Sequence, residues 1–265
     1  MTARVVLILA GRGDASSEAV GLGLAQRGCP VVRASAADLA LAKWYHAEGE
    51  GTRVVLPDGT PLDDGRIGAV LNRLEGPDLP QFARAPAEDR DYAAAEFAAL
   101  LASWLNGLSD RGVPVANPPG SDDAWSAALH PLGWHALAVA HRLRVGDFAV
   151  ASSVRGGVCR GLERVGAGDW PSGCDVAGWY RTAPGRGAVR RVWVFGADCG
   201  GLEAGLATRC TAFVRALGLR YAALDFVEER GGLRLIEVVA RPPLDDAALA
   251  GRCVRWLSAA LEGAR

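Results

Sequence analysis

The chain has 265 residues, half of them hydrophobic, so it can bury a full core in one large domain or in two to three small ones. Its 29 basic and 30 acidic residues nearly cancel, which argues against a nucleic-acid or anionic membrane partner. The longest early apolar run, Val5–Ala10, is far too short to span a bilayer, and no cleavage-type segment follows it. We therefore expect a cytoplasmic protein.

The cysteine and lysine counts limit the chemistry further. The six cysteines form no C-x-x-C pair, which argues against a zinc knuckle or a redox dithiol, so most are expected to be reduced core residues. Lys43 is the single lysine, and all other basic residues are arginine. No later lysine can therefore form a Schiff base or hold a phosphate as a compact point charge.

The first 120 residues follow the pattern of an open α/β sheet. Residues 4–34 predict strand, helix and strand, with Asp14 or Ser16 of the turn GRGDASS as the helix cap. A third strand is predicted at 66–74 and a long helix at 88–108. GRGDAS lacks the third glycine of G-x-G-x-x-G, which counts against dinucleotide binding.

The sequence pattern changes twice along the rest of the chain. VPVANPPG ends the first part with a short strand, and the glycine-rich residues that follow predict loops with a helix near 134–141 and a strand at FAVASS. RRVWVFG then predicts a strand, 202–217 a helix, and the segment after it a hairpin and a last helix. The expected domains are 1–116, an N-terminal α/β domain, 117–180, a reduced central subdomain, and 181–265, a C-terminal domain.

The hairpin LDFVEERGGLRLIEVV carries two acids that face each other. If it turns near residues 230–232, Asp225 lies opposite Glu237 or one step off. Facing carboxylates destabilise a strand pair unless a cation lies between them. Mg²⁺ carrying the phosphates of a nucleotide would serve, and so would Arg190 or Arg191 of the preceding strand. Spacing alone favours the arginine.

Several motifs resemble the ATP-grasp superfamily. VRRVWVFG, a helix, LGLRYAALDF and LIEVVARPPL are similar to the C-terminal half of that superfamily. VLNRL and DYAAAEFAALLASWL resemble the N-terminal domain of its RimK-type and peptide-modifying members. The resemblance implies an α/β, ATP-grasp-like fold, with an N-terminal Rossmann-like open sheet and a C-terminal α+β grasp domain.

The resemblance also implies a chemistry and a set of site residues. Such proteins are ATP-dependent carboxylate–amine or carboxylate–thiol ligases that pass through an acyl phosphate, with Mg²⁺ held by Asp, Glu and Asn. The metal ligands carry over to Asp225 and Glu237, and the arginine that meets phosphate or acyl phosphate carries over to Arg191. The following proline matches Pro242, but the asparagine position is Val239, which has no ligand atom.

The central region departs further from that pattern. It is short and holds no lysine for the nucleotide phosphates, and only Arg155 with its two glycines, or Arg160 with Gly161, could imitate the lid. We therefore expect a degenerate nucleotide site, which counts against ATP binding.

Three functions stay open at this point. The first is a ligase-like protein of a biosynthetic or peptide-modification pathway, acting on a small carboxylate or a peptide. The second is a non-catalytic relative, a pseudoenzyme, that holds a peptide, a metabolite or a catalytic partner subunit. The third is a nucleotide-independent enzyme that uses the same cleft. The resemblance and the apolar last helix make a homodimer a reasonable expectation.

Overall fold

A computed structural model gives the structure of the protein, and its chain divides into two compact units. Unit 1 comprises residues 1–128, 218–221 and 240–265, and unit 2 comprises residues 129–217 and 222–239. The structure describes residues 4–47, 51–119, 131–151, 162–166, 178–182, 187–244 and 246–263. The three-part division at residues 116 and 180 stays a prediction.

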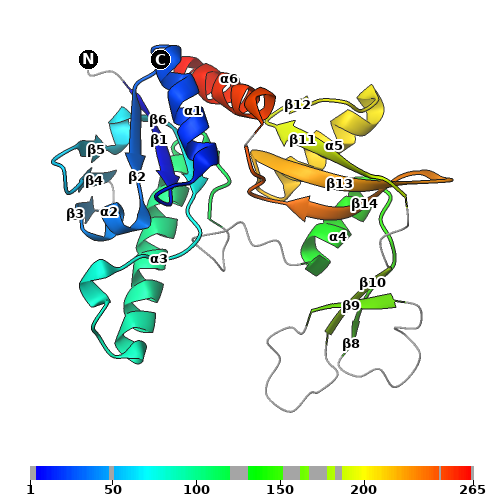
Figure 1. The fold of residues 1–265 in the computed structure, drawn as a ribbon, viewed down its shortest axis with the longest axis horizontal. Coiled ribbons are helices and arrows are strands. Elements are labelled where there is room, and N and C mark those ends of the chain that lie inside the picture. Colours follow the sequence, from blue (N-terminus) through cyan, green and yellow to red (C-terminus); the bar gives the residue numbers. More distant parts are fainter. Residues whose placement is uncertain are drawn as a thin grey trace. The chain divides into compact units, whose positions relative to one another are not determined.

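The centre of unit 1 is a parallel sheet in the order β2-β1-β6-β7 (Figure 1). Its strands are β1 (Val5–Ala10), β2 (Val31–Ala34), β6 (Ile67–Arg73) and β7 (Val115–Ala116). Every residue of β1 and β6 is buried, as expected for parallel strands covered on both faces, and this explains the apolar runs Val5–Ala10 and 67–71. Helix α1 (Ala15–Gln26) joins β1 to β2, which confirms the predicted β-α-β opening.

One face of this sheet packs against α3 (Ala87–Asp110) and a small antiparallel sheet. That sheet has the order β3-β4-β5, with β3 (Lys43–Ala47), β4 (Gly51–Val55) and β5 (Pro61–Asp63). Trp104 of α3 meets Trp44 edge to face, with ring centroids 5.2 Å apart, and its Nε1 donates to Asp64 at 2.9 Å. The short elements here are α2 (Ala36–Ala40), η1 (Asp64–Arg66) and η2 (Pro80–Phe82).

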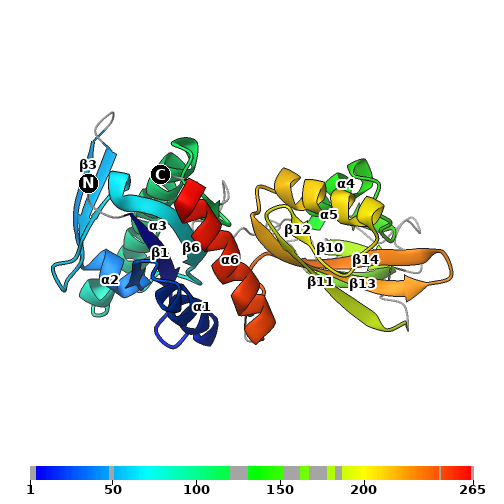
Figure 2. The same ribbon diagram turned by 90° about the horizontal axis from the view of Figure 1, so that it is seen from above.

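The other face packs against α1 and the last helix, α6 (Ala247–Gly263) (Figure 2). Two glycines allow this close approach. A Cβ at Gly68 of β6 would lie 2.4 Å from Leu261, and one at Gly23 of α1 would lie 2.8 Å from Val254. The last helix is therefore part of the core of the N-terminal sheet.

Asn117 holds the chain at two of the four points where it passes between the units. It is buried and lies in the left-handed region, with φ of 57°. Its Oδ1 accepts from the backbone N–H groups of Arg220 and Tyr221, at 3.1 and 3.2 Å, and its Nδ2 donates to the Ala240 carbonyl. One amide side chain thus fixes the start of one strand and the end of the next.

Arg73 adds a second buried fastening beside it. Its Nε donates to Asp14 at 2.6 Å, and its Nη1 donates to the Tyr221 hydroxyl at 3.0 Å and to the Pro242 carbonyl at 3.1 Å. Burial raises the pKa of Tyr221 to about 12, against the opposing effect of Arg73.

The predicted helix cap is corrected by this network. Asp14 stands at the N-cap position of α1, but its side chain caps no backbone group, because its carboxylate is bound to Arg73. Ser16, the alternative, instead accepts from the backbone N–H of Leu244 at 2.8 Å. Both side chains thus hold distant segments of unit 1.

Unit 2 contains two antiparallel sheets, in the orders β8-β10-β9 and β12-β11-β13-β14. The strands of the first are β8 (Phe148–Ala151), β9 (Leu162–Gly166) and β10 (Gly178–Thr182). Those of the second are β11 (Val189–Phe195), β12 (Asp198–Cys199), β13 (Tyr221–Glu229) and β14 (Gly232–Val239). Helices α4 (Pro131–Ala140) and α5 (Ala204–Ala216) pack together beside the second sheet.

These elements confirm the predicted α/β class, with a parallel sheet in unit 1 and antiparallel sheets in unit 2. Among the described residues, Cys29, Cys199, Cys210 and Cys253 form no disulfide, while Cys159 and Cys174 lie outside the described residues. Across the part of the chain that the structure describes, no helix combines the length and the apolar character needed to cross a membrane.

Candidate functional site

The hairpin of β13 and β14 sets the candidate site. Asp225 pairs with Glu237, and Ala223 and Leu224 pair with Val239 and Val238, so the predicted register is confirmed. Directly after Asp225 the register shifts by one residue, a β-bulge. The two acids therefore occupy directly opposed positions at the edge of an irregularity in the ladder.

The two carboxylates differ in their surroundings. Asp225 is 4% exposed and lies among the buried residues of β13, whereas Glu237 is exposed on β14. A buried carboxylate needs hydrogen-bond donors or a cation to compensate for its lost hydration. The site thus has one acid in the interior and one facing water.

Arg191 of β11 supplies that compensation to Asp225. Its Nε donates to one carboxylate oxygen and its Nη2 to the other, each at 2.7 Å, which is a bidentate pair. The hydrogen bond to Asp225, together with the nearby charge of Glu237, raises the pKa of Arg191. Arg190, the other arginine considered, instead donates to the Gly201 carbonyl. Arg191 is therefore the cation beside the facing acids.

Half of the Arg191 side chain stays accessible. Its exposed fraction is 43%, against 5% for the Asp225 side chain. The guanidinium is thus held on one edge by a buried carboxylate and faces solvent elsewhere, where it can meet an anionic group. This arrangement suits recognition of a phosphate or a carboxylate.

Val239 and Pro242 add no ligand to this cluster. Val239 pairs with Ala223 and offers no ligand atom, and the Pro242 carbonyl accepts from Arg73 in unit 1. Arg155 and Arg160 lie outside the described residues. Within the described ranges, no three His, Cys, Asp or Glu side chains come close enough together to hold a metal ion. Magnesium binding by Asp225 and Glu237 stays a prediction.

Reading the sequence missed the roles of Arg73 and Asn117. A signal for Arg73 was present, because an arginine at the end of the buried strand VLNRL needs a partner for its charge. Asn117 precedes two prolines, a pattern that by itself indicates only the end of a strand. Its left-handed backbone is a conformation in which asparagine is enriched.

Comparisons with known proteins identify the fold. No protein-family model matches the chain, and no curated protein matches it. Among solved structures, the ATP-grasp ligase PsnB in complex with a minimal precursor, Mg and ADP superposes with a TM-score of 0.76 at 16% identity, covering 97% of this chain and 98% of that one.

Two further solved structures agree. The macrocyclase MdnC from Microcystis aeruginosa MRC, bound to the precursor peptide MdnA, has a TM-score of 0.73 at 12% identity over 96% of this chain and 99% of its own. A RiPP-associated ATP-grasp ligase from Chryseobacterium gregarium, in complex with ADP and a leader and core peptide, has a TM-score of 0.68 at 12% identity over 97% of each chain. The predicted resemblance is confirmed at the level of the fold, and the chain has the fold of the ATP-grasp ligases.

Proposed function

We propose that the chain is an ATP-grasp-type, ligase-like protein of peptide modification with a degenerate nucleotide site. The observation that carries the proposal is that Arg191, Asp225 and Glu237 come together on strands of one sheet. Support for a peptide as the ligand comes from PsnB and MdnC, which share the fold and were solved with precursor peptides.

The donor set fits Mg²⁺ in part. Asp225 and Glu237 offer the carboxylate oxygens that this hard cation prefers, and waters would complete its shell. Val239 adds no oxygen, and Lys43 is the single lysine of the chain and lies on β3 of unit 1. Bound with a nucleotide, Mg²⁺ would neutralise phosphate charge. The phosphate contacts from this cluster would come from Arg191.

In this proposal Arg191 binds either Asp225 or an anionic ligand. Without a ligand it neutralises Asp225, and with an anionic ligand it donates to a phosphate or an acyl phosphate. Asp225 would then be released to hold a cation. The bidentate pair thus keeps a buried carboxylate compensated until a ligand arrives.

Titration of the purified protein with ATP and Mg²⁺ tests this proposal. We expect measurable heat from the natural protein and at least about a tenfold loss of affinity in the Asp225→Asn, Glu237→Gln double variant, because both cation ligands are neutralised. The double variant Asp198→Asn, Glu228→Gln removes the same charge from exposed positions of unit 2 and should bind normally. A folded natural protein that gives no heat at millimolar nucleotide would contradict an ATP-dependent role.

Arg191→Met should change the affinity for Mg²⁺ alone and the affinity for Mg²⁺ with ATP in opposite directions. Mg²⁺ alone should bind about tenfold more tightly, because Asp225 is freed from its guanidinium partner. Mg²⁺ with ATP should bind more weakly than to the natural protein, because the phosphate contact is lost. Competition of Mn²⁺, followed by its paramagnetic relaxation, measures the first value. Unchanged binding of both ligands would exclude the two-partner role of Arg191.

One observation favours a second candidate, a non-catalytic relative that binds a peptide. Both oxygens of Asp225 are already occupied by Arg191, and Val239 provides no third ligand. Such a protein would bind a peptide with equal affinity in the presence and absence of nucleotide. Fluorescence anisotropy can distinguish the ligase-like role from the non-catalytic role. It would use labelled peptides encoded by genes next to the gene for this protein, with and without nucleotide.

A further inference from the structure

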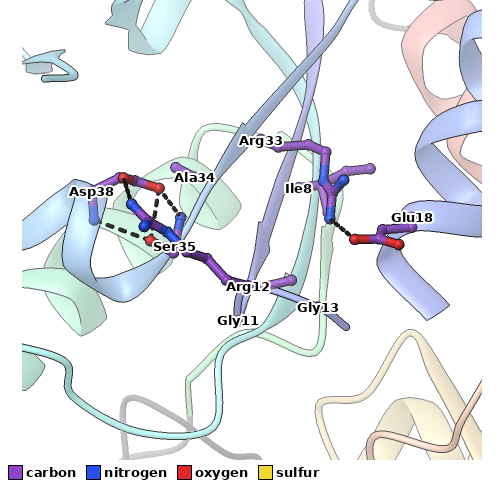
Figure 3. A pocket seen from close by; sticks show the side chains of 10 residues that line it. Ile8, Gly11, Arg12, Gly13, Glu18, Arg33, Ala34, Ser35 and Asp38 are labelled. Atoms are coloured by element: carbon purple, nitrogen blue, oxygen red, sulfur yellow. Dashed lines mark hydrogen bonds and ion pairs between the residues drawn. The ribbon is translucent and has the colours of Figure 1, made fainter. Parts of the chain in front are cut away.

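A pocket of about 250 Å³ lies in unit 1, at the carboxyl ends of β1 and β2 (Figure 3). Ile8, Ala10 and Ala34 are buried and form its apolar floor. The carboxyl ends of parallel strands are the usual place for ligands in open α/β sheets. All of the residues that line this pocket belong to unit 1 and lie apart in sequence from Arg191, Asp225 and Glu237.

Two arginines come to this pocket from different elements. Arg12 belongs to the turn after β1 and reaches toward Ser35 and Asp38, while Arg33 is on β2 and lies beside Ile8 and Glu18 (Figure 3). Their side chains are 82% and 43% exposed, so both guanidinium groups are accessible. Two accessible guanidinium groups at one small pocket provide the donors that a multivalent anion needs.

Asp38, one of the two acids of the pocket, has a partner outside the arginines that explains its presence. Asp38 forms a capping box with Ser35, accepting from its N–H at 2.9 Å and from its hydroxyl at 2.7 Å. Burial tends to raise the pKa of Asp38, but the hydrogen bonds from Ser35 and Arg12 outweigh this effect and lower it. The Asp38 carboxylate is thus committed mainly to the start of α2.

The contacts of the arginines with these acids are weak. Arg12 meets Asp38 at 3.2 Å at an exposed position, and Arg33 lies 3.8 Å from Glu18, beyond hydrogen-bond length. Exposed ion pairs of this kind contribute only about 0–1 kcal/mol. Each guanidinium has five N–H donors, so most remain for a ligand. An anion with a higher charge density can therefore replace either acid.

We propose that this pocket binds the phosphate group of a small phosphorylated metabolite between Arg12 and Arg33. One water occupies about 30 Å³ in the liquid, so the pocket offers the room of roughly eight waters. That volume suits a molecule of the size of a pentose phosphate. The apolar floor receives the carrier, and the two arginines hold the phosphate oxygens. This site goes beyond the proposed function, because none of its residues belongs to the hairpin site.

Calorimetric titration with inorganic phosphate and with ribose 5-phosphate, at low ionic strength, tests the proposal. Both should bind, ribose should not, and added salt should weaken the binding. Arg12→Gln and Arg33→Gln should each weaken it by about tenfold or more, the effect of losing charge-assisted hydrogen bonds. Arg53→Gln removes the same charge from another exposed ion pair of unit 1 and should change nothing. Binding of inorganic phosphate without binding of ribose 5-phosphate would overturn the assignment to a phosphorylated metabolite, and tighter binding of ribose 5-phosphate than of inorganic phosphate would support it.

Glu18→Gln tests whether the bound ligand is negatively or positively charged. If the ligand is a phosphate, removal of this neighbouring negative charge should tighten binding severalfold. A ligand with an ammonium group, such as a free amino acid, would lose affinity instead, and that result would overturn the proposal. So would failure of both phosphates to bind at millimolar concentration, or equal binding by the natural protein and the two arginine variants.

Folding and the hairpin site can be separated from this result. Arg33 also donates to Ser17 at 3.0 Å, so Arg12→Gln carries the test if Arg33→Gln does not fold. The Asp225→Asn, Glu237→Gln variant should keep its affinity for ribose 5-phosphate. The pocket and the proposed ligase-like function can therefore fail independently.

Discussion

Asn117→Ala is expected to lower the free energy of unfolding by about 3–5 kcal/mol. The change leaves the backbone N–H groups of Arg220 and of the buried Tyr221 without their acceptor and the Ala240 carbonyl without its donor. It also places a Cβ-bearing residue with no side-chain amide at φ of 57°, where asparagine is tolerated better than alanine. Denaturant unfolding monitored by tryptophan fluorescence measures the loss.

Two further variants separate the causes of that loss. Asn117→Gly keeps the left-handed backbone and removes only the amide, so it should be more stable than Asn117→Ala by about 1 kcal/mol. Asn106→Ala makes the same chemical change at an exposed position of α3 and should leave stability unchanged or slightly raised. A loss at Asn117 no larger than the change at Asn106 would mean that the amide does not fasten the chain.

Asp14→Asn is expected to lower the free energy of unfolding at neutral pH by about 3 kcal/mol, because it leaves a buried guanidinium without its counter-ion. The Arg73 side chain is 9% exposed and that of Asp14 is 20% exposed, so solvent screens this pair less than any surface pair. Thermal and denaturant unfolding should both report the change.

A double variant distinguishes loss of the pair from loss of one partner. Asp14→Asn with Arg73→Met removes both charges, and it should recover part of the stability lost in Asp14→Asn alone. The exposed pair of Arg53 and Asp63 serves as the control, since Asp63→Asn should cost less than about 1 kcal/mol. If Asp14→Asn and Asp63→Asn lower the free energy of unfolding equally, the buried pair of Asp14 and Arg73 stabilises the fold no more than an exposed pair.

The regular elements could be predicted because their patterns are local. Each pattern lies within one segment: β1 is covered on both faces and is apolar throughout, whereas α3 buries one face and carries the stripe of Phe97, Leu101, Trp104 and Leu108. The pairing of Asp225 with Glu237 followed from the position of a Gly-Gly turn, because a hairpin register is fixed by its turn. The small sheet of β3, β4 and β5 was not predicted, since its strands are short and polar on one side.

The polar contacts across the chain could not be predicted. Arg73 and Asp14 are separated by 59 residues, and Asn117 and Ala240 by 123, so no local period reports them. The choice between Arg190 and Arg191 depended on the register of β11 against β13, two strands joined through a helix rather than a turn. Spacing could therefore name the acids of the candidate site but could not choose between the two arginines, and only the family resemblance pointed to Arg191.

Unit 1 is formed by three separate segments of the chain, so its parts are synthesised at different times on the ribosome. Its sheet is made first, but the helix that covers one face, α6, is made last. Chains grow at about 5–20 residues per second, so the apolar face around Gly68 stays uncovered for on the order of ten seconds until α6 has been synthesised. During that interval the nascent chain offers a hydrophobic surface to chaperones. Variants that weaken the contact of α1 with α6 should therefore lower both the stability of the folded protein and its yield in the cell.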